Sequence, residues 1–382
     1  MIKTKEEDLI EKFGWSRTSS ITDRNDRTIK EYREKILKEV CKSLIDFIGL
    51  KKIIDFDTFK EKLREACSGD GNEIKKITTA YSSSLCSLLF FYNVSDNNSL
   101  TLKKYNIEDE LEKTFEFTKV LFEFKNIVIS GGKPSNIDVV LLGKDKNNEN
   151  NKVILFLESK FFEYYRDTTK KVEISKAYLN KNDIGKLIYD KNVVTKIFNN
   201  DVDFKISDKI YIYPKENKPC YIEGIKQMIS HYIGVNNLLK EKLYESDNLI
   251  KLYNFLEKGE FDIKNLKNKL QDENIEIYLG EIIFDNIIGD FKLTDEENDS
   301  CFKNYIEKYK ALAKILNKKE GYNIDKDNVL NNRIKVLEEP LVYSLFKEAK
   351  KIDEIKYEIK LEIKDDKIKD YYDKIRKYYQ LK

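Results

Sequence analysis

The hydrophobic positions of the chain follow a helical repeat in some stretches and a strand repeat in others. Residues 1–75 place apolar side chains three and four positions apart among charged ones, which predicts amphipathic helices. Residues 77–94, "ITTAYSSSLCSLLFFYNV", predict a further helix with Leu85, Leu88 and Leu89 on one face and small serines on the opposite face. A narrow serine face of this kind would let the helix approach another backbone closely.

The repeat changes to that of strands from residue 114 onward. Residues 114–129 are rich in Phe and Val with partial alternation, and shorter apolar runs follow at 137–143 and 152–161. The turn-forming "SGGKPSN" separates the first two runs, and the polar "KDKNNENN" predicts a loop over residues 144–151. The pattern therefore predicts a meander of three strands.

Helical spacing returns in residues 220–239, and residues 274–286 again have the pattern of a strand. The expected order is helix, three strands, helix, strand. This order predicts an α/β protein. Two less regular stretches, at about 166–218 and 241–273, are interpreted as insertions into this core.

The predicted organisation has three parts. A helical N-terminal region covers residues 1–75, the core with its insertions covers residues 76–290, and a mainly helical region covers residues 291–382.

The charge balance and the single histidine narrow the chemistry that the chain can support. Lys and Arg number 70 against 68 acidic residues, so the formal net charge of +2 gives no argument for a polyanionic partner. His231 is the only histidine, which argues against zinc enzymes with several His ligands. No nucleophile elbow and no phosphate-binding glycine loop is present. Carboxylates and lysine remain as candidate catalytic groups.

The five cysteines are widely spread and form no CxxC pair, which fits free thiols in a reducing compartment. The first residues lack the apolar segment of a signal peptide, and no apolar run approaches the length that spans a bilayer. The sequence therefore predicts a cytoplasmic protein without a membrane partner.

Three ionisable residues interrupt the apolar runs of the meander. Asp138 lies in the second run, and Glu158 and Lys160 lie in the third. Because side chains two apart on a strand share a face, Glu158 and Lys160 should be neighbours, and pairing of the two runs should bring Asp138 beside Glu158. Two buried like charges are costly unless a cation compensates them.

A hard divalent cation would supply that compensation. Mg²⁺, with Mn²⁺ as a substitute, prefers a few carboxylate oxygens plus retained waters, and the carbonyl of Ser159 would complete a partial cage with Asp138 and Glu158. The Lys160 ammonium could then hold and help to deprotonate an attacking water, or neutralise charge in the transition state. The chemistry predicted by these residues is hydrolysis of a phosphodiester bond without a covalent intermediate.

The segments "PSNIDVVLL" and "FLESKF" resemble the PD-(D/E)xK nuclease superfamily, which has the restriction-endonuclease-like fold. The resemblance implies a mixed central sheet that is flanked by helices. The resemblance covers residues 77–165 and resumes over residues 219–286. It implies that Asp138, Glu158 and Lys160 form the metal-binding and catalytic set. It also implies a role for Gln227, which would orient a catalytic group or contact phosphate.

The sequence departs from this family at two positions. The first core helix carries no acidic residue, so a third carboxylate would have to come from Glu116 or Glu123, of which Glu123 is the one assigned here as a metal ligand. The proline of the motif is Pro134, displaced from Asp138.

The resemblance implies a Mg²⁺-dependent endonuclease that acts on DNA, with double-stranded DNA as the expected partner. It also implies a role in restriction or defence and a homodimer that cuts both strands. Two other functions fit the same residues. One is a nucleic-acid-binding or assembly protein that kept the fold and lost metal binding, and the other is an RNase.

Several further residues have both a structural and a functional interpretation. His231 is a structural histidine or a phosphate contact. Tyr164 and Tyr165 pack in the core or stack on bases, and Glu163 is an outer metal-shell candidate. Basic residues of the first insertion form either a solvated surface or a flap that binds a nucleic-acid backbone. These basic residues are Arg166, Lys170, Lys171, Lys176, Lys181 and Lys186.

Overall fold

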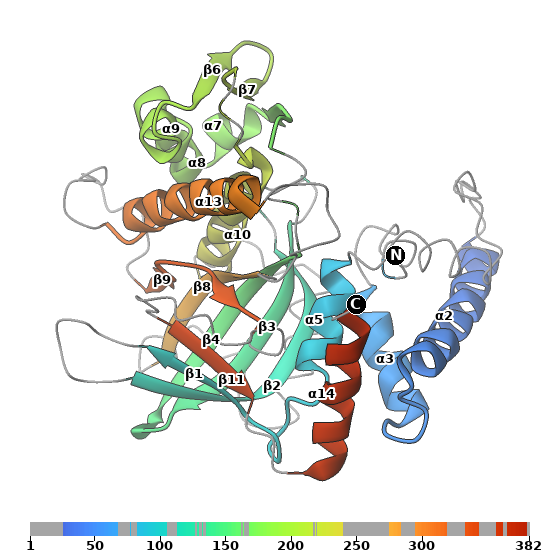
Figure 1. Ribbon diagram of the computed structural model, residues 1–382. Coiled ribbons are helices and arrows are strands. Elements are labelled where there is room, and N and C mark those ends of the chain that lie inside the picture. Colours follow the sequence, from blue (N-terminus) through green and yellow to red (C-terminus); the bar gives the residue numbers. More distant parts are fainter. Residues whose placement is uncertain are drawn as a thin grey trace.

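The three apolar runs of the meander form the antiparallel centre of a large curled sheet in the computed structural model (Figure 1). These strands are β2 (Lys113–Asn126), β3 (Ser135–Asp145) and β4 (Asn148–Lys160). Strand β8 (Ile275–Ile283) lies beside β4 and runs parallel to it. The sheet is therefore mixed, as the family resemblance implied.

The structure describes residues 26–67, 77, 82–104, 113–126, 128–129, 132, 135–161, 163, 168–216, 218, 220–239, 275–283, 295–318, 333–343, 357–361 and 365–379.

The sheet continues on both sides through strands that the sequence pattern did not assign. On one side β1 (Leu100–Lys104) pairs with β2, and β11 (Tyr357–Leu361) pairs with β1, both antiparallel. On the other side β9 (Ile334–Val336) and β10 (Leu341–Val342) pair with β8 in parallel. The strand order among the described residues is β10-β8-β4-β3-β2-β1-β11, with β9 also on β8. The C-terminal region thus contributes strands to the core sheet.

The loop predicted over residues 144–151 is mostly strand. Asp145 pairs with Asn148, and the side chain of Asp145 accepts a hydrogen bond from the Asn147 main-chain N–H, so the chain reverses in a tight turn. The polar composition of this stretch suggested a longer loop than the pairing requires.

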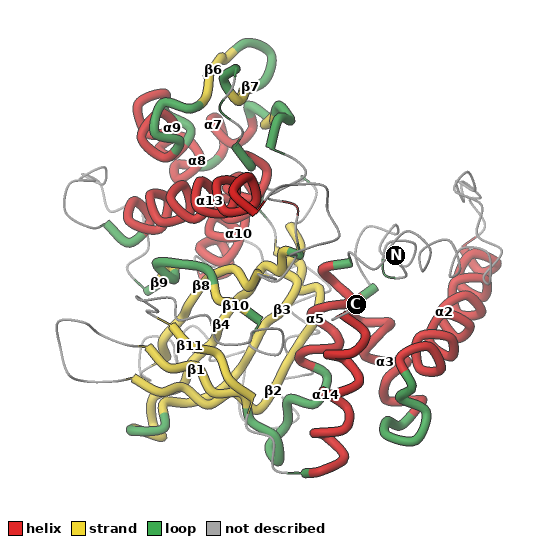
Figure 2. The backbone as a smooth tube through the Cα atoms, viewed as in Figure 1, coloured by secondary structure: helices red, strands yellow, loops and turns green. Residues whose placement is uncertain are grey.

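Two layers of helices cover the sheet (Figures 1 and 2). Alternation along the strands feeds two cores, because Val139 packs with one helical layer and Val140 with the other. The first layer consists of α2 (Asp26–Ile48), α3 (Phe56–Ala66), α5 (Ser83–Phe91) and α14 (Asp366–Tyr379). The second consists of α10 (Ile222–Leu239), α13 (Asp295–Leu316) and the first insertion.

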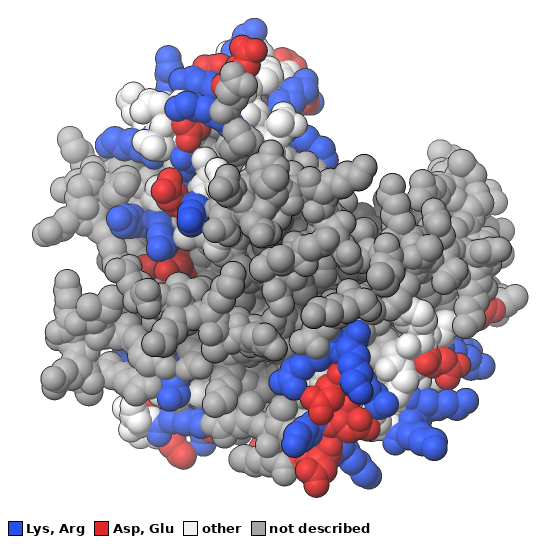
Figure 3. Space-filling view, viewed as in Figure 1, with Lys and Arg blue, Asp and Glu red and all other residues white. Residues whose placement is uncertain are grey.

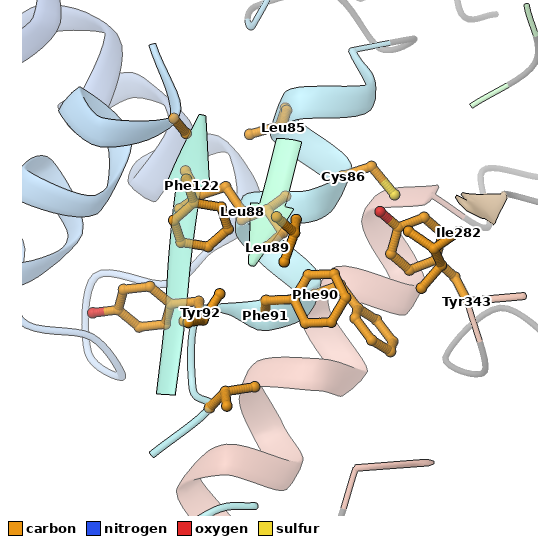
Figure 4. Packing of buried hydrophobic residues seen from close by; sticks show 14 of the residues in the cluster. Leu85, Cys86, Leu88, Leu89, Phe90, Phe91, Tyr92, Phe122, Ile282 and Tyr343 are labelled. Carbon is orange, nitrogen blue, oxygen red and sulfur yellow. The ribbon is translucent and has the colours of Figure 1, made fainter. Parts of the chain in front are cut away.

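Helix α5 is shorter than predicted and is buried on all sides. The Ser82 side chain accepts a hydrogen bond from the Leu85 main-chain N–H and begins the helix. Every residue from Leu85 to Phe91 is buried, so the apolar stripe predicted for one face is part of a wholly buried element. Figure 4 shows its aromatic end beside Tyr343, whose ring lies 4.8 Å from that of Phe90.

The first insertion folds into a small unit of its own beside α13 (Figure 1). Its strands form a second, three-stranded sheet in the order β5-β7-β6. Its elements are β5 (Val172–Ile174), α7 (Ala177–Lys181), α8 (Asp183–Ile188), α9 (Lys191–Ile197), β6 (Val202–Ile206) and β7 (Ile210–Pro214). A buried ion pair of 2.6 Å between Lys308 of α13 and Asp201 joins this unit to the second helical layer. The second insertion, 241–273, lies outside the described residues.

Within the described part of the chain, no helix has both the length and the apolar character needed to cross a membrane.

Candidate active site

Asp138 and Glu158 lie at the same end of the sheet, where β3 begins and β4 ends. The register pairs Val139 with Leu157, so Asp138 and Glu158 are the next residues on their two neighbouring strands. Asp138 Oδ2 accepts a hydrogen bond from the Ser159 main-chain N–H at 2.7 Å. The structure thus brings together two carboxyl groups that are far apart in the sequence.

Lys160 joins this pair to helix α10. Its Nζ donates to Glu158 Oε1 at 2.6 Å and to the side-chain oxygen of Gln227, also at 2.6 Å. Glu158 and Lys160 are both 4% exposed, so the ion pair is buried. Gln227 was predicted to orient a catalytic group, and in the structure it contacts Lys160.

Neighbouring charges determine the protonation states of Glu158 and Lys160. Burial raises the pKa of Glu158, but the Lys160 ammonium and the His231 imidazole outweigh burial and lower it to about 2. Burial lowers the pKa of Lys160, but the surrounding acids, Glu158 foremost, raise it well above its ordinary value. The pair is therefore a carboxylate and an ammonium at neutral pH.

His231 closes the other side of Glu158. Its Nε2 lies 2.8 Å from Glu158 Oε2, and its Nδ1 lies 2.9 Å from the hydroxyl oxygen of Ser135 at the start of β3. The imidazole is 1% exposed. His231, for which the sequence allowed a structural role or a phosphate contact, thus orients Glu158, a candidate metal ligand.

A cluster of acids surrounds Asp138. Burial of the carboxyl group and then the charges of Glu158 and Glu123 raise the pKa of Asp138 well above its usual range. Glu123 is itself buried on β2 and has a φ of 50°, an uncommon conformation for a residue other than glycine. Glu116, the other candidate for a third carboxylate, accepts a hydrogen bond from Ser99 near the opposite end of β2 and lies away from this cluster.

Ser159 connects the site to the first helical layer. Its hydroxyl lies 2.7 Å from that of Tyr343 and donates to the Ser83 carbonyl of α5 at 3.3 Å. The serine-rich end of α5 does therefore approach a strand closely. Tyr343, which follows β10 and is fully buried, was not singled out in the sequence.

Glu281 is a site residue that the sequence analysis missed. It lies opposite Glu158 in the parallel pairing of β4 and β8, it is 0% exposed, and its Oε2 accepts a hydrogen bond from the Tyr305 hydroxyl of α13. Burial raises the pKa of Glu281 to about 8. The signal was available, because "YLGEII" places an acid inside an apolar strand, as "FLESKF" does.

The remaining sequence candidates fall outside this network or outside the described residues. Glu163 accepts a hydrogen bond from the Phe161 main-chain N–H at 2.8 Å, and its charge acts on Lys160 and Glu281. Lys171 of the insertion pairs with Glu173 at the surface. Figure 3 shows Lys and Arg interspersed with Asp and Glu over the insertion. Tyr164, Tyr165 and Arg166 lie outside the described residues.

The carboxyl groups of the site fit a divalent cation in part. Among the described residues, no group of three or more His, Cys, Asp or Glu side chains is placed to hold a metal ion. Mg²⁺ requires fewer protein ligands, because it keeps several waters. Asp138 fits, since only Oδ2 has a hydrogen-bond partner in the described part of the chain and neighbouring acids disfavour its charge.

Glu158 fits on one condition. Both of its oxygens already have a hydrogen-bond partner, Lys160 at Oε1 and His231 at Oε2. A cation in contact with Glu158 would therefore have to replace one of these partners.

No family model matches the sequence, and no curated protein or solved structure matches the chain.

Proposed function

We propose that the protein is a Mg²⁺-dependent endonuclease that hydrolyses phosphodiester bonds of double-stranded DNA, built on a restriction-endonuclease-like core. One observation carries the proposal: Asp138 and Glu158 occupy adjacent positions on β3 and β4, with Lys160 hydrogen-bonded to Glu158. The order of helix, meander, helix and parallel strand supports the core assignment.

Asp138 and Glu158 would hold the cation, with the Ser159 carbonyl beside them. The cation, when bound, would activate a water and stabilise negative charge on the phosphate. Asp138 is positioned for this role by the Ser159 main-chain N–H, which fixes one oxygen and leaves the other available. A buried acid whose pKa is raised by neighbouring carboxylates, as that of Asp138 is, is suited to a site that gains a cation.

Lys160 acts as a charged donor in this proposal. Because the surrounding acids raise its pKa, the amine keeps its proton at neutral pH and is a poor general base. Of the two roles inferred from the sequence, stabilisation of the transition-state charge is therefore favoured over deprotonation of water. Gln227 holds the ammonium in place through its side-chain oxygen.

A second function is favoured by a different observation. Both Glu158 oxygens are occupied by protein partners, an arrangement that also suits a nucleic-acid-binding protein that lost metal binding. In that case Lys160 and His231 replace the cation as the compensating groups.

Cleavage of supercoiled plasmid DNA with and without Mg²⁺ tests the proposal. Wild type should nick the plasmid only with the metal, and Glu158→Gln and Lys160→Met should each lose at least about 100-fold in rate, the scale of one removed catalytic interaction. Glu149→Gln is the matched control, because Glu149 is an exposed acid on the same strand β4.

Three results would change the proposal. Nicking that survives in both site variants would indicate a contaminating nuclease. Mg²⁺-independent DNA binding without cleavage would favour the second function. Cleavage of RNA but not DNA, in parallel reactions, would redirect the proposal to an RNase.

A further inference from the structure

Lys160 has an unused hydrogen-bond donor. An ammonium group has three N–H donors, and within the described residues Lys160 uses two of them, for Glu158 and Gln227. The hydrogen bond to Glu158 depends on the state of the site, because Glu158 is also a candidate metal ligand. An ammonium that is 4% exposed cannot replace a lost carboxylate with bulk water.

Glu281 has an unused acceptor close to this ammonium. Tyr305 donates to Oε2, while Oε1 is buried and has no hydrogen-bond partner among the described residues. The Lys160 ammonium acts on Glu281 electrostatically, and Glu281 acts on Lys160 in return. A buried carboxyl oxygen without a hydrogen-bond partner is energetically unfavourable. The presence of such an oxygen on Glu281 therefore needs a functional explanation.

We propose that Glu281 is the reserve counter-ion of Lys160, a positioning residue that holds the ammonium when Glu158 turns from Lys160 to a bound divalent cation. The inference rests on the proposed metal-dependent function and assigns a role within the same site. The pairing of β4 with β8 places Glu281 level with Glu158, so Lys160 can exchange one carboxylate for the other without leaving the sheet end.

The charges around Glu281 favour such an exchange. Burial raises the pKa of Glu281, Lys160 opposes burial, and the negative charge of Glu158 adds to it. A cation bound at Glu158 would offset the negative charge of that carboxylate, while the attraction between Lys160 and Glu281 stays. Tyr305 keeps the carboxyl group oriented throughout.

A comparison of thermal stability tests the counter-ion role without metal. Glu281→Gln alone should leave Tm unchanged or raise it, because it replaces a buried acid by an amide while Glu158 still holds Lys160. In a Glu158→Gln background the same change should lower Tm, because Lys160 then loses the carboxylate that lies level with the lost one on β8. When Lys160→Met is also present in the Glu158→Gln background, Glu281→Gln should no longer lower Tm.

Glu163→Gln is the matched control, because Glu163 also acts on Lys160 electrostatically but lies outside β8. Its effect on Tm should have the same sign in both backgrounds. If Glu281→Gln shows no reversal while the wild type binds Mg²⁺, the reserve role is wrong and the proposed function is unaffected.

Calorimetric titration of the full-length protein with Mg²⁺ and Mn²⁺ tests the exchange itself and needs only the single variant. Glu281→Gln should weaken cation binding by about tenfold or more, since Lys160 would be left without the β8 carboxylate that takes the place of Glu158. Unchanged affinity would overturn the inference. Absence of cation binding by the wild type would overturn the proposed function and this inference together.

Discussion

Glu281 should give the protein a pH-dependent stability that is traceable to one residue. Its pKa is about 8 in the folded chain against 4.5 as its ordinary value, because burial and the charges of Glu158 and Glu163 outweigh Lys160 and Tyr305. The folded state therefore binds more protons than the unfolded state between these values, so this contribution is present below pH 4.5 and is lost as pH rises through about 8.

We expect Glu281→Gln to gain stability relative to wild type as pH rises from about 5 to 8, by at most about 1.4 kcal/mol per pH unit. Urea unfolding at half-unit pH intervals measures the difference. Glu276→Gln, on the same strand, is the control, because burial raises the pKa of Glu276 but Lys113 and Lys335 lower it to about 2. The Glu276 contribution is lost only in acid, so the stability difference between Glu276→Gln and wild type should stay constant from about pH 5 to 8. A constant difference for Glu281→Gln would contradict the prediction.

The alternation of a strand was enough to predict which charged residues share the site on β3 and β4. Asp138, Glu158 and Lys160 stand out because each interrupts an apolar run, and their runs are adjacent in sequence. Glu281 carries the same signal, but its strand joins β4 by a parallel pairing that a local pattern does not reveal. The contact between His231 and Glu158 depends in the same way on how α10 packs over the sheet.

The backbone of β2 lies so close to Gly143 of β3 that it leaves no room for a side chain there. A Cβ atom there would lie 2.0 Å from the Glu116 carbonyl oxygen, beside the bulge between Phe117 and Lys119. Because that neighbour is backbone, a strand would have to move. We expect Gly143→Ala to destabilise the protein by about 1–3 kcal/mol or more, as overpacking does in other cores.

Guanidinium unfolding of Gly143→Ala measures this cost. Gly132→Ala is the matched control, because Gly132 is exposed and its added Cβ would lie 3.1 Å from the Ile129 carbonyl oxygen. The control should lose much less stability than Gly143→Ala. Equal losses would show that the approach of β2 to β3 does not limit the residue at position 143.

Local patterns predicted the elements of the meander better than the elements at the sheet edges. The long runs of β2 and β4 contain enough apolar residues to be predicted as strands from the sequence. Strands β9 and β10 are only three and two residues long, which is too short for such a pattern. Strands this short form because they can pair with the edge of β8. That pairing depends on the tertiary fold and cannot be read from the local sequence. The same dependence explains why β11 was not predicted in a region expected to be mainly helical.

At the scale of the whole molecule, the C-terminal region completes both the sheet and the site. Leu337 packs against Gly280 so closely that a Cβ on the glycine would lie 2.6 Å from it. Tyr343 hydrogen-bonds with Ser159 next to the catalytic candidates, and the Tyr371 hydroxyl of α14 donates to the Leu89 carbonyl of α5. Residues beyond 290 therefore join the same sheet and the same cores as the predicted core region.

A chain that ends at residue 290 should consequently fail to fold cooperatively. It would lack α13, α14 and the strands β9, β10 and β11, so β8 would expose an unpaired edge and the fully buried partners of both cores would be missing. Differential scanning calorimetry should show one cooperative transition for the full chain and none for the shortened one. A chain lacking only the last three residues, 380–382, is the matched control and should melt as the full chain does. A cooperative transition of the shortened chain near the full-length Tm would instead show that residues 76–290 form an independent domain and that the C-terminal strands are additions to it.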